Sequence, residues 1–297
     1  MPRRYLAEGA LVLAAFFFGI TFVLVQDAIE DITPTAYVTL RFLIGFAAIA
    51  PFAWVIARRH RDPAGLLWKA GAVAGALLLA GYITQTVGLQ YTESSTSAFI
   101  TGLYAIFTPI IEAIVRRRLP PAAVCGGIAI ATGGLFLLTG AELSMGRGEL
   151  LTLLCALSFA VWIVYQGVYA NRLHTIPFMA VQMGVLAMLS APFTAATGIG
   201  QLTALALFAA AFTGIACSAV ALSLQLYGQR RVSPSRSALI LLMEPVFAGV
   251  AGYLGGERLG PVKLLGAGVI LVGIVVAELA PARAKEEEET AASGAPA

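Results

Sequence analysis

The sequence has little charge and few residues of the kinds that bind metals or form disulfides. Charged residues make up 12% of the 297 residues, against about 25% in soluble domains. The three cysteines, Cys125, Cys155 and Cys217, lie in apolar runs without C-x-x-C spacing, and the two histidines, His60 and His174, lie in candidate loops. This pattern argues against a disulfide framework or a metal site. There is also no basic patch interleaved with aromatics, so we expect no metal, no cofactor and no nucleic-acid partner.

Most of the chain consists of apolar residues. Hydrophobic residues make up 59% of the chain and the mean hydropathy is +0.86, against about 45–50% apolar residues in soluble domains. Each membrane crossing takes roughly 20 apolar residues, because the backbone polar groups must be satisfied within the span. The sequence therefore predicts an all-α integral membrane protein with ten transmembrane helices and no soluble domain. The predicted ranges are 9–26, 34–57, 69–89, 96–115, 121–139, 148–169, 177–197, 204–226, 234–254 and 262–280.

Four of these runs begin at a proline: Pro34, Pro121, Pro177 and Pro234. Proline suits the first turn of a helix, where its missing N–H is harmless. After the last run, residues 282–297 hold four consecutive glutamates and then small residues. Such a segment cannot bury a core, so we expect a disordered cytoplasmic tail.

Basic residues predict the orientation of the chain. Fifteen of the nineteen Lys and Arg residues fall in alternate loops or tails on one side, whereas the opposite side holds Arg147, Arg258 and Lys263, and Arg41 lies inside a run. The positive-inside rule then puts both termini in the cytoplasm, which requires an even number of helices. The fifteen are Arg3, Arg4, Arg58, Arg59, Arg61, Lys69, Arg116, Arg117, Arg118, Arg172, Arg230, Arg231, Arg236, Arg283 and Lys285.

An internal repeat divides the chain into two five-helix halves, residues 1–140 and 141–281. At an offset of 140, Gln85 and Gly88 match Gln225 and Gly228, and at 141 the tripeptide at 50–52 matches the one at 191–193. Because five is odd, the second half must be inverted relative to the first, as in many secondary transporters whose site lies between the repeats.

These repeats also resemble a known family. The segments Ala98–Tyr104, Glu244–Ala248 and Gly255–Leu259, in this order and spacing, are similar to those of EamA-type members of the drug/metabolite transporter superfamily. The resemblance covers residues 8–280 and is greatest to exporters of aromatic amino acids. It implies a ten-helix exporter whose third, fourth, eighth and ninth helices line the cavity, with the fifth and tenth behind them. Arg116-Arg-Arg-Leu119 departs from the pattern, so Glu257 has no acidic counterpart in the first half.

Polar and aromatic side chains recur at helical spacing on four predicted spans. Residues three or four apart share one helix face, and polar groups within a span mark a face turned away from lipid. Cavity lining is one interpretation, and interhelical hydrogen bonding with aromatics as filler is the other. The stripes are Leu78, Tyr82, Gln85 and Leu89; Ser97, Thr101, Tyr104, Thr108 and Glu112; Ser158, Trp162, Tyr165 and Tyr169; and Ser218, Leu222, Gln225 and Gln229.

The candidate binding residues come from these stripes. Gln85 and Gln225 are repeat mates whose amides suit a carboxylate and an ammonium group, unless they bond each other or the backbone. Aromatic rings can stack on a solute or attract its ammonium. The predicted substrate-binding residues are Tyr82, Gln85, Phe99, Thr101, Trp162, Gln225 and Glu244.

Charged residues within the runs carry separate hypotheses. Glu244 lies halfway along its helix, where a carboxylate is costly and indicates either proton coupling or a structural bond. Glu112 is expected to pair with Arg116 one turn later, near the inner surface. Arg41 is expected to snorkel to the outer interface. Glu257 is expected to stay in an outer loop.

Pro109 and Pro245 are predicted to kink their helices and act as hinges for alternating access, or else to shape the cavity.

The predicted function is a secondary transporter of the plasma membrane, the inner membrane in bacteria, that exports amino acids, aromatic ones in particular. We expect a monomer. An exporter of drugs or other metabolites is the alternative; phosphate-bearing solutes are disfavoured because the stripes contain no Lys or Arg. An intramembrane enzyme is disfavoured by the lack of a buried histidine and of paired metal ligands.

Overall fold

The computed structural model describes residues 2–60, 62–92, 94–117, 121–139, 146–254, 260–262 and 264–276. Regular structure in these ranges is helical, and the one extended pairing they contain is an isolated bridge between Ile32 and Gly200. The all-helical prediction is confirmed. The expected tail at 282–297 and Glu257 lie outside the described residues.

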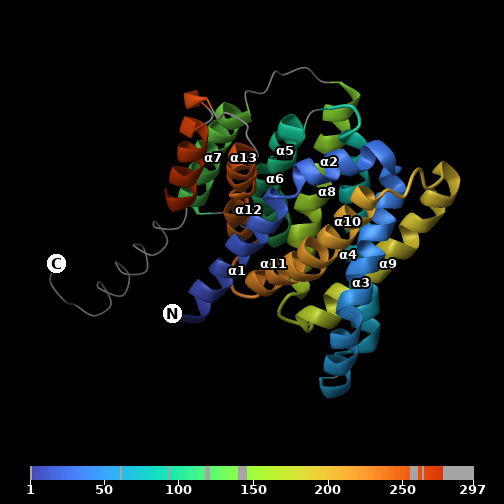
Figure 1. Cartoon of the computed structure of the whole chain (residues 1–297). Helices are drawn as coiled ribbons and strands as arrows, with labels where there is room; N and C mark the ends of the chain where they lie inside the picture. Colours follow the sequence, from blue (N-terminus) through green and yellow to red (C-terminus); the bar gives the residue numbers. More distant parts are fainter. Residues whose placement is uncertain are drawn as a thin grey trace, which may run out of the picture.

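Each of the ten predicted apolar ranges contains a helix, but several are divided (Figure 1). The helices are α1 (Pro2–Gly19), α2 (Phe22–Asp31), α3 (Pro34–Arg59), α4 (Ala64–Gly88), α5 (Ser94–Gly102), α6 (Tyr104–Arg116), α7 (Ala122–Thr139), α8 (Arg147–Tyr169), α9 (Thr175–Thr197), α10 (Ala204–Phe212), the π-helical η1 (Thr213–Ala221), α11 (Leu222–Gln229), α12 (Pro234–Leu241), α13 (Glu244–Leu254) and a last helix, Leu264–Val276.

Five of these segments are long and apolar enough to cross a membrane. They are α3, α4, α8, α9 and the continuous run Ala204–Gln229 formed by α10, η1 and α11. The pair α1 and α2, bent by 42°, makes a sixth if it is one span. α7 and Leu264–Val276 are shorter apolar helices. The chain is therefore a multi-pass membrane protein, whereas ten spans and their inverted arrangement stay predictions.

Helix starts follow the local sequence. Thr33 caps α3 by accepting a hydrogen bond from the backbone N–H of Ala36, and Pro34 occupies the first turn. Ser233 and Pro234 do the same for α12. A capping hydroxyl followed by proline satisfies one free N–H and removes another, which is why these helices begin where the prolines predict.

The breaks within predicted spans recur at the repeat offset. α5 gives way to α6 at Leu103, and α12 to α13 at Leu242 and Met243, so the two second pieces begin at Tyr104 and Glu244, 140 residues apart. Pro245 lies directly after the second break and cannot donate to the carbonyl of Leu241. Pro109 instead lies buried inside α6, beyond the first break. Its kink is thus not the cause of that break, and the hinge role of both prolines stays a prediction.

Glycines allow close helix packing on both sides of the bundle. A Cβ at Gly75 of α4 would lie 2.6 Å from the carbonyl oxygen of Gln182 on α9. At the other side, a Cβ at Gly273 in Leu264–Val276 would lie 2.5 Å from the carbonyl of Gly127 on α7, and these two helices stand together at the edge of the bundle (Figure 1).

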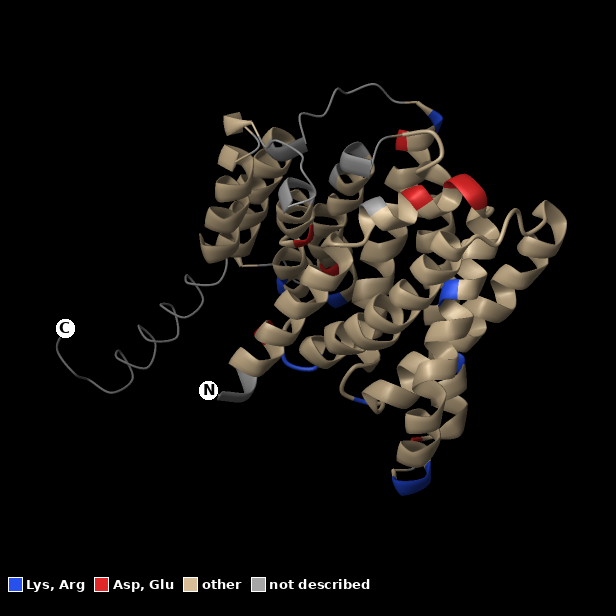
Figure 2. Ribbon diagram, in the orientation of Figure 1, with Lys and Arg blue, Asp and Glu red and all other residues tan. Residues whose placement is uncertain are grey.

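Figure 2 shows basic segments gathered mostly toward one end of the bundle and several acidic ones at the other.

Candidate solute-binding cavity

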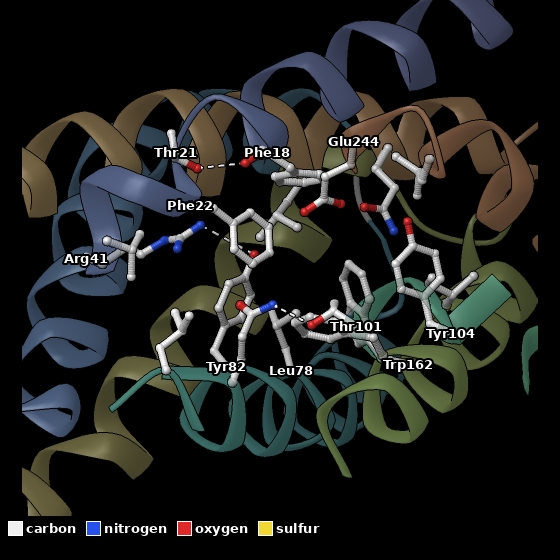
Figure 3. A pocket seen from close by; sticks show the side chains of 18 residues that line it. Phe18, Thr21, Phe22, Arg41, Leu78, Tyr82, Thr101, Tyr104, Trp162 and Glu244 are labelled. Carbon is white, nitrogen blue, oxygen red and sulfur yellow. Dashed lines mark hydrogen bonds between the residues drawn. The ribbon is translucent and has the colours of Figure 1, made fainter. Parts of the chain in front are cut away.

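A cavity lies where the broken helices meet, enclosing about 630 Å³ of empty space including its mouth (Figure 3). Its walls come from both halves of the chain, and α7 and Leu264–Val276 supply none of the described lining, as the resemblance implies. The lining residues are Phe18, Thr21, Phe22, Val25, Arg41, Leu78, Tyr82, Gln85, Leu89, Thr101, Tyr104, Phe159, Trp162, Ile163, Leu222, Gln225, Leu241 and Glu244. The α1–α2 segment, α3 and α8 thus contribute beyond the four helices that the resemblance names.

Irregular backbone surrounds the cavity. Thr21 lies at the break between α1 and α2, Tyr104 begins α6, and Leu241 and Glu244 flank the break before α13. A Cβ at Gly19 would lie 2.4 Å from the carbonyl of Glu244, so the first and the last of these breaks are in contact. Interrupted helices at membrane depth are tolerated where they are buried in protein or line a cavity, and transporters place their sites at such points.

The structure brings six of the predicted binding residues together on the cavity wall: Tyr82, Gln85, Thr101, Trp162, Gln225 and Glu244. The side chain of the seventh, Phe99, lies outside the described residues. The α4 stripe lines the cavity completely, through Leu78, Tyr82, Gln85 and Leu89. Binding of a solute by these residues stays a prediction.

The α8 stripe is the poorest match to the predicted cavity face. Of its four residues only Trp162 lines the cavity; the Ser158 hydroxyl donates to the carbonyl of Leu154 at 2.8 Å, and the rings of Tyr165 and Tyr169 pack on each other. The Trp162 indole N–H donates to Oε1 of Gln182 on α9 at 2.8 Å. This polar group is therefore satisfied within the protein, and Trp162 offers the cavity its ring alone.

The two glutamine repeat mates differ in their partners. Nε2 of Gln85 donates to the Thr101 hydroxyl at 3.2 Å. Gln225 is 2% exposed, and its Nε2 has no hydrogen-bond partner among the described residues. The two amides do not bond each other, contrary to one interpretation of the sequence, and Gln225 retains a free donor beside the cavity.

The position of the Arg41 side chain differs from the prediction made from the sequence. It is 5% exposed, and its Nε donates to the Ser218 hydroxyl of η1 at 3.0 Å while Nη2 donates to the Tyr82 hydroxyl at 3.4 Å. The guanidinium thus points into the bundle and does not snorkel to an interface. Its presence on the wall also removes the argument that the cavity has no cation to match a phosphate.

Glu244 is the second charged residue of the wall (Figure 3). It is the first residue of α13, and no described side chain donates a hydrogen bond to its carboxylate or pairs with it within 4.0 Å. The structural interpretation is a carboxylate that is protonated or bonded to a neighbouring helix end; among the described residues no such bond is found, and the protonated form stays a prediction.

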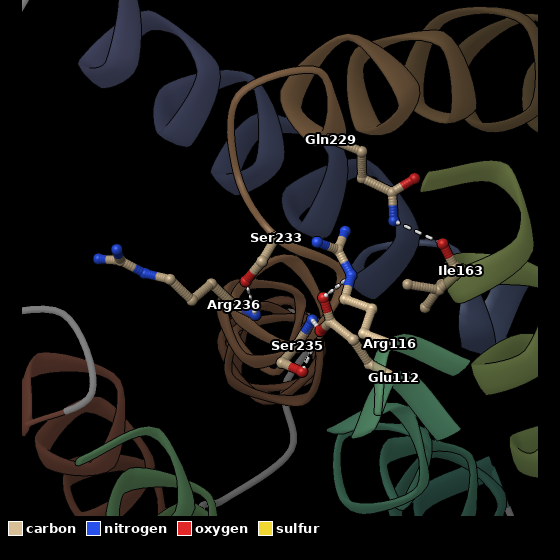
Figure 4. Close-up of polar contacts among 7 residues, drawn as sticks. All are labelled: Glu112, Arg116, Ile163, Gln229, Ser233, Ser235 and Arg236. Carbon is tan, nitrogen blue, oxygen red and sulfur yellow. Dashed lines mark hydrogen bonds and ion pairs between the residues drawn. The ribbon is translucent and has the colours of Figure 1, made fainter. Parts of the chain in front are cut away.

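Glu112 lies outside the cavity in a bonded cluster (Figure 4). Its Oε1 is 2.9 Å from Nε of Arg116, as the helical spacing predicts. Its Oε2 accepts the backbone N–H of Ser235 at 2.9 Å and also the Ser235 hydroxyl. The second contact, which no sequence pattern indicated, joins α6 of the first half to the start of α12 in the second.

Comparison with known proteins gives the class. An uncharacterized transporter of Archaeoglobus fulgidus is 30% identical over 279 residues, 93% of this chain and 87% of that protein. The uncharacterized inner membrane transporter YedA of Escherichia coli is 29% identical over 288 residues, 91% of this chain and 90% of that protein. A crystal structure at 20% identity shares the fold, with a TM-score of 0.75 over 92% of this chain and 96% of the other. The two named relatives and the membrane-spanning helices thus put this chain in the class of multi-pass membrane transporters.

The family follows from the match to a family model. The model of the EamA-like transporter family matches residues 6–139 and again residues 146–279. The chain belongs to this family, which is part of the drug/metabolite transporter superfamily.

Proposed function

We propose that this protein exports amino acids, aromatic ones in particular, across the bacterial inner membrane by alternating access between its two halves. The observation that carries the proposal is the cavity wall, where the rings of Tyr82, Phe159 and Trp162 lie with the amides of Gln85 and Gln225. Rings provide a niche for an apolar side chain, and amides provide donors and an acceptor for a polar head group.

The proposed orientation has both termini in the cytoplasm. It is supported by the distribution of charge, because basic segments gather mostly toward one end of the bundle (Figure 2). Positive residues are retained on the cytoplasmic side during membrane insertion. In this orientation the contact between Glu112 and Ser235 lies toward the cytoplasm.

Counterflow in liposomes tests the substrate. Trp162→Ala and Phe159→Ala should reduce exchange of Trp and Phe relative to Ala and Ser, because they remove ring contacts worth about 0.5–1.5 kcal/mol each, or roughly 2- to 12-fold. Gln225→Ala should reduce exchange of all amino acids alike, since the head group is common to them. The matched control is Gln229→Ala, which removes a buried amide of the same helix that bonds Gln166 outside the cavity. Equal effects of the four variants on every amino acid would contradict the proposed site.

Energy coupling is tested at Glu244. If its carboxylate carries the coupled proton, Glu244→Gln should abolish pH-driven accumulation yet preserve exchange at equilibrium when the substrate is saturating. Loss of both activities at normal protein yield would contradict a coupling role.

Export of another small metabolite is the second candidate, and Arg41 is the observation that favours it. A buried guanidinium on the wall suits organic anions in general, phosphates included. The same counterflow assay with sugar phosphates inside the liposomes distinguishes the two candidates.

A further inference from the structure

Arg41 holds a buried charge that forms no ion pair with a carboxylate among the described residues. It lies seven residues into α3, about 10 Å along the helix at 1.5 Å per residue, inside a segment long and apolar enough to cross the membrane. Its two hydrogen-bond acceptors, the hydroxyls of Ser218 and Tyr82, are neutral. Among the described residues, no carboxylate lies within 4.0 Å of it. A buried cation whose counter-charge is too far away for an ion pair keeps an unmet demand for charged acceptors, so the site is suited to an anionic group of a solute.

The surroundings of Arg41 aim its guanidinium at the cavity. The π-helical turn of η1 carries Ser218, and η1 touches α3 closely, since a Cβ at Gly214 would lie 2.6 Å from the carbonyl of Arg41. On the other side, the Tyr82 ring lies with its centroid 4.6 Å from the guanidinium carbon. Two of the five guanidinium N–H groups are used by these contacts, and the others have no acceptor among the described residues.

A second donor on the same wall is also unused. Nε2 of Gln225 is buried and has no partner among the described residues. Buried polar groups are nearly always bonded, and an exception in a cavity wall indicates a missing ligand. Arg41 and Gln225 thus both line one cavity and both hold N–H groups without a partner among the described residues, which suits a solute rich in acceptor oxygens.

Glu244 supplies the opposite charge. Of the described residues that line the cavity, Arg41 and Glu244 are the two that carry charge, and they do not form an ion pair with each other. Figure 3 shows both charged groups directed at the same space. With one positive and one negative wall group, the empty cavity is formally neutral, and a solute with one charge of each sign leaves it so.

We infer that Arg41 binds the carboxylate of the transported solute while Glu244 faces its ammonium group, so the cavity selects zwitterions over simple amines and simple acids. The inference deepens the proposed function and rests on it for the identity of the solute as an amino acid. Arg41 and Glu244 then recognise what all amino acids share, and the rings distinguish among side chains.

The test uses four probes that share a phenyl ring: L-phenylalanine, phenethylamine without the carboxylate, 3-phenylpropionate without the ammonium group, and phenyl phosphate. Ligand-dependent protection against thermal unfolding of the purified full chain gives an apparent affinity for each. Wild type should prefer phenylalanine by about tenfold or more over each of the other three, because each lacks a charged hydrogen-bonding group that the cavity matches. Arg41→Gln should lose about tenfold for phenylalanine and 3-phenylpropionate and keep its affinity for phenethylamine. Glu244→Gln should lose about tenfold for phenylalanine and phenethylamine and keep its affinity for 3-phenylpropionate.

The controls separate recognition from folding. Arg58→Gln is matched, because Arg58 lies on the same helix and stacks on the Trp54 ring at 3.7 Å but is exposed, and it should change no affinity. If Arg41→Gln does not fold, Ser218→Ala keeps the charge and removes one neutral acceptor, and it should weaken phenylalanine several-fold while leaving phenethylamine unchanged.

The inference is overturned if Arg41→Gln binds the carboxylates as wild type does, if no carboxylate protects wild type, or if phenyl phosphate protects it best. Counterflow separates this failure from failure of the proposed function. If wild type exchanges no amino acid in liposomes, yet carboxylate protection depends on Arg41, the export proposal fails and the Arg41 assignment stands. If amino acids exchange and Arg41→Gln exchanges them equally well, the assignment alone fails.

Discussion

Replacing Glu112 by alanine should destabilise the protein far more than replacing Arg116, although the two side chains form one ion pair. The Glu112 side chain is 8% exposed and that of Arg116 is 54% exposed. An exposed pair at this helical spacing contributes about 0.3–0.5 kcal/mol. The larger contribution comes from the other carboxylate oxygen, which accepts both the backbone N–H and the hydroxyl of Ser235. This N–H belongs to the first turn of α12, where the helix dipole also favours a negative charge.

The magnitude follows from those bonds. A hydrogen bond to a charged group contributes about 1.5–3 kcal/mol, and Glu112 accepts two such bonds from Ser235. Glu112→Ala should therefore cost about 3–5 kcal/mol, Ser235→Ala about 1.5–3 kcal/mol because one donor remains, and Arg116→Ala less than about 0.5 kcal/mol.

Thermal and denaturant unfolding of the purified chain in detergent measure this order. Glu112→Gln is the informative intermediate, because its amide oxygen still accepts from Ser235 but the charge is gone. Equal shifts for Glu112→Ala and Arg116→Ala would refute the argument, since they would mean that the bonds to Ser235 contribute nothing to stability.

Two further predictions concern topology and motion. Single cysteines at 58–60, 64–69 or 230–233 should resist impermeant thiol reagents added outside intact cells, and cysteines at 27–31 should react; the reverse would overturn the orientation. Pro109→Ala and Pro245→Ala should slow exchange by more than they weaken ligand protection, because they act on the conformational step. Equal losses would point to cavity shape instead.

Hydropathy predicted that each of the ten apolar ranges contains a helix, and proline positions predicted two of the helix starts. Pro34 and Pro234 predicted the starts of α3 and α12 because capping is a local property of a few residues. The break at Leu103 was not predicted. Nothing in the residues around it removes a hydrogen bond, and the sequence signal, Pro109, lies inside α6, beyond the break.

The cavity was predicted on α4, where all four residues of the stripe line it, and less well on α8. The difference lies in the partner helix. The Trp162 indole N–H donates to Gln182 of α9. The spacing of residues along α8 cannot reveal an acceptor that lies on another helix. Arg41 was assigned the wrong direction for the same reason, since its hydroxyl partners, Ser218 and Tyr82, come from two other elements. Its isolation as a charged residue within an apolar run was nonetheless a signal, because such a residue indicates function by default.

The cluster at Glu112 bears on the proposed alternating access. In the structure this contact ties α6 to the start of α12, so a conformation opening the cavity between these helices must break it. If the contact contributes about 3 kcal/mol in the closed form, breaking it without replacement would lower the open population about 150-fold. Water entering the opened end solvates the carboxylate and the Ser235 N–H, which offsets most of that cost. A contact between a carboxylate and a helix start is therefore suited to a gate. The contact is strong while it is buried, and it costs little free energy to break once water reaches it.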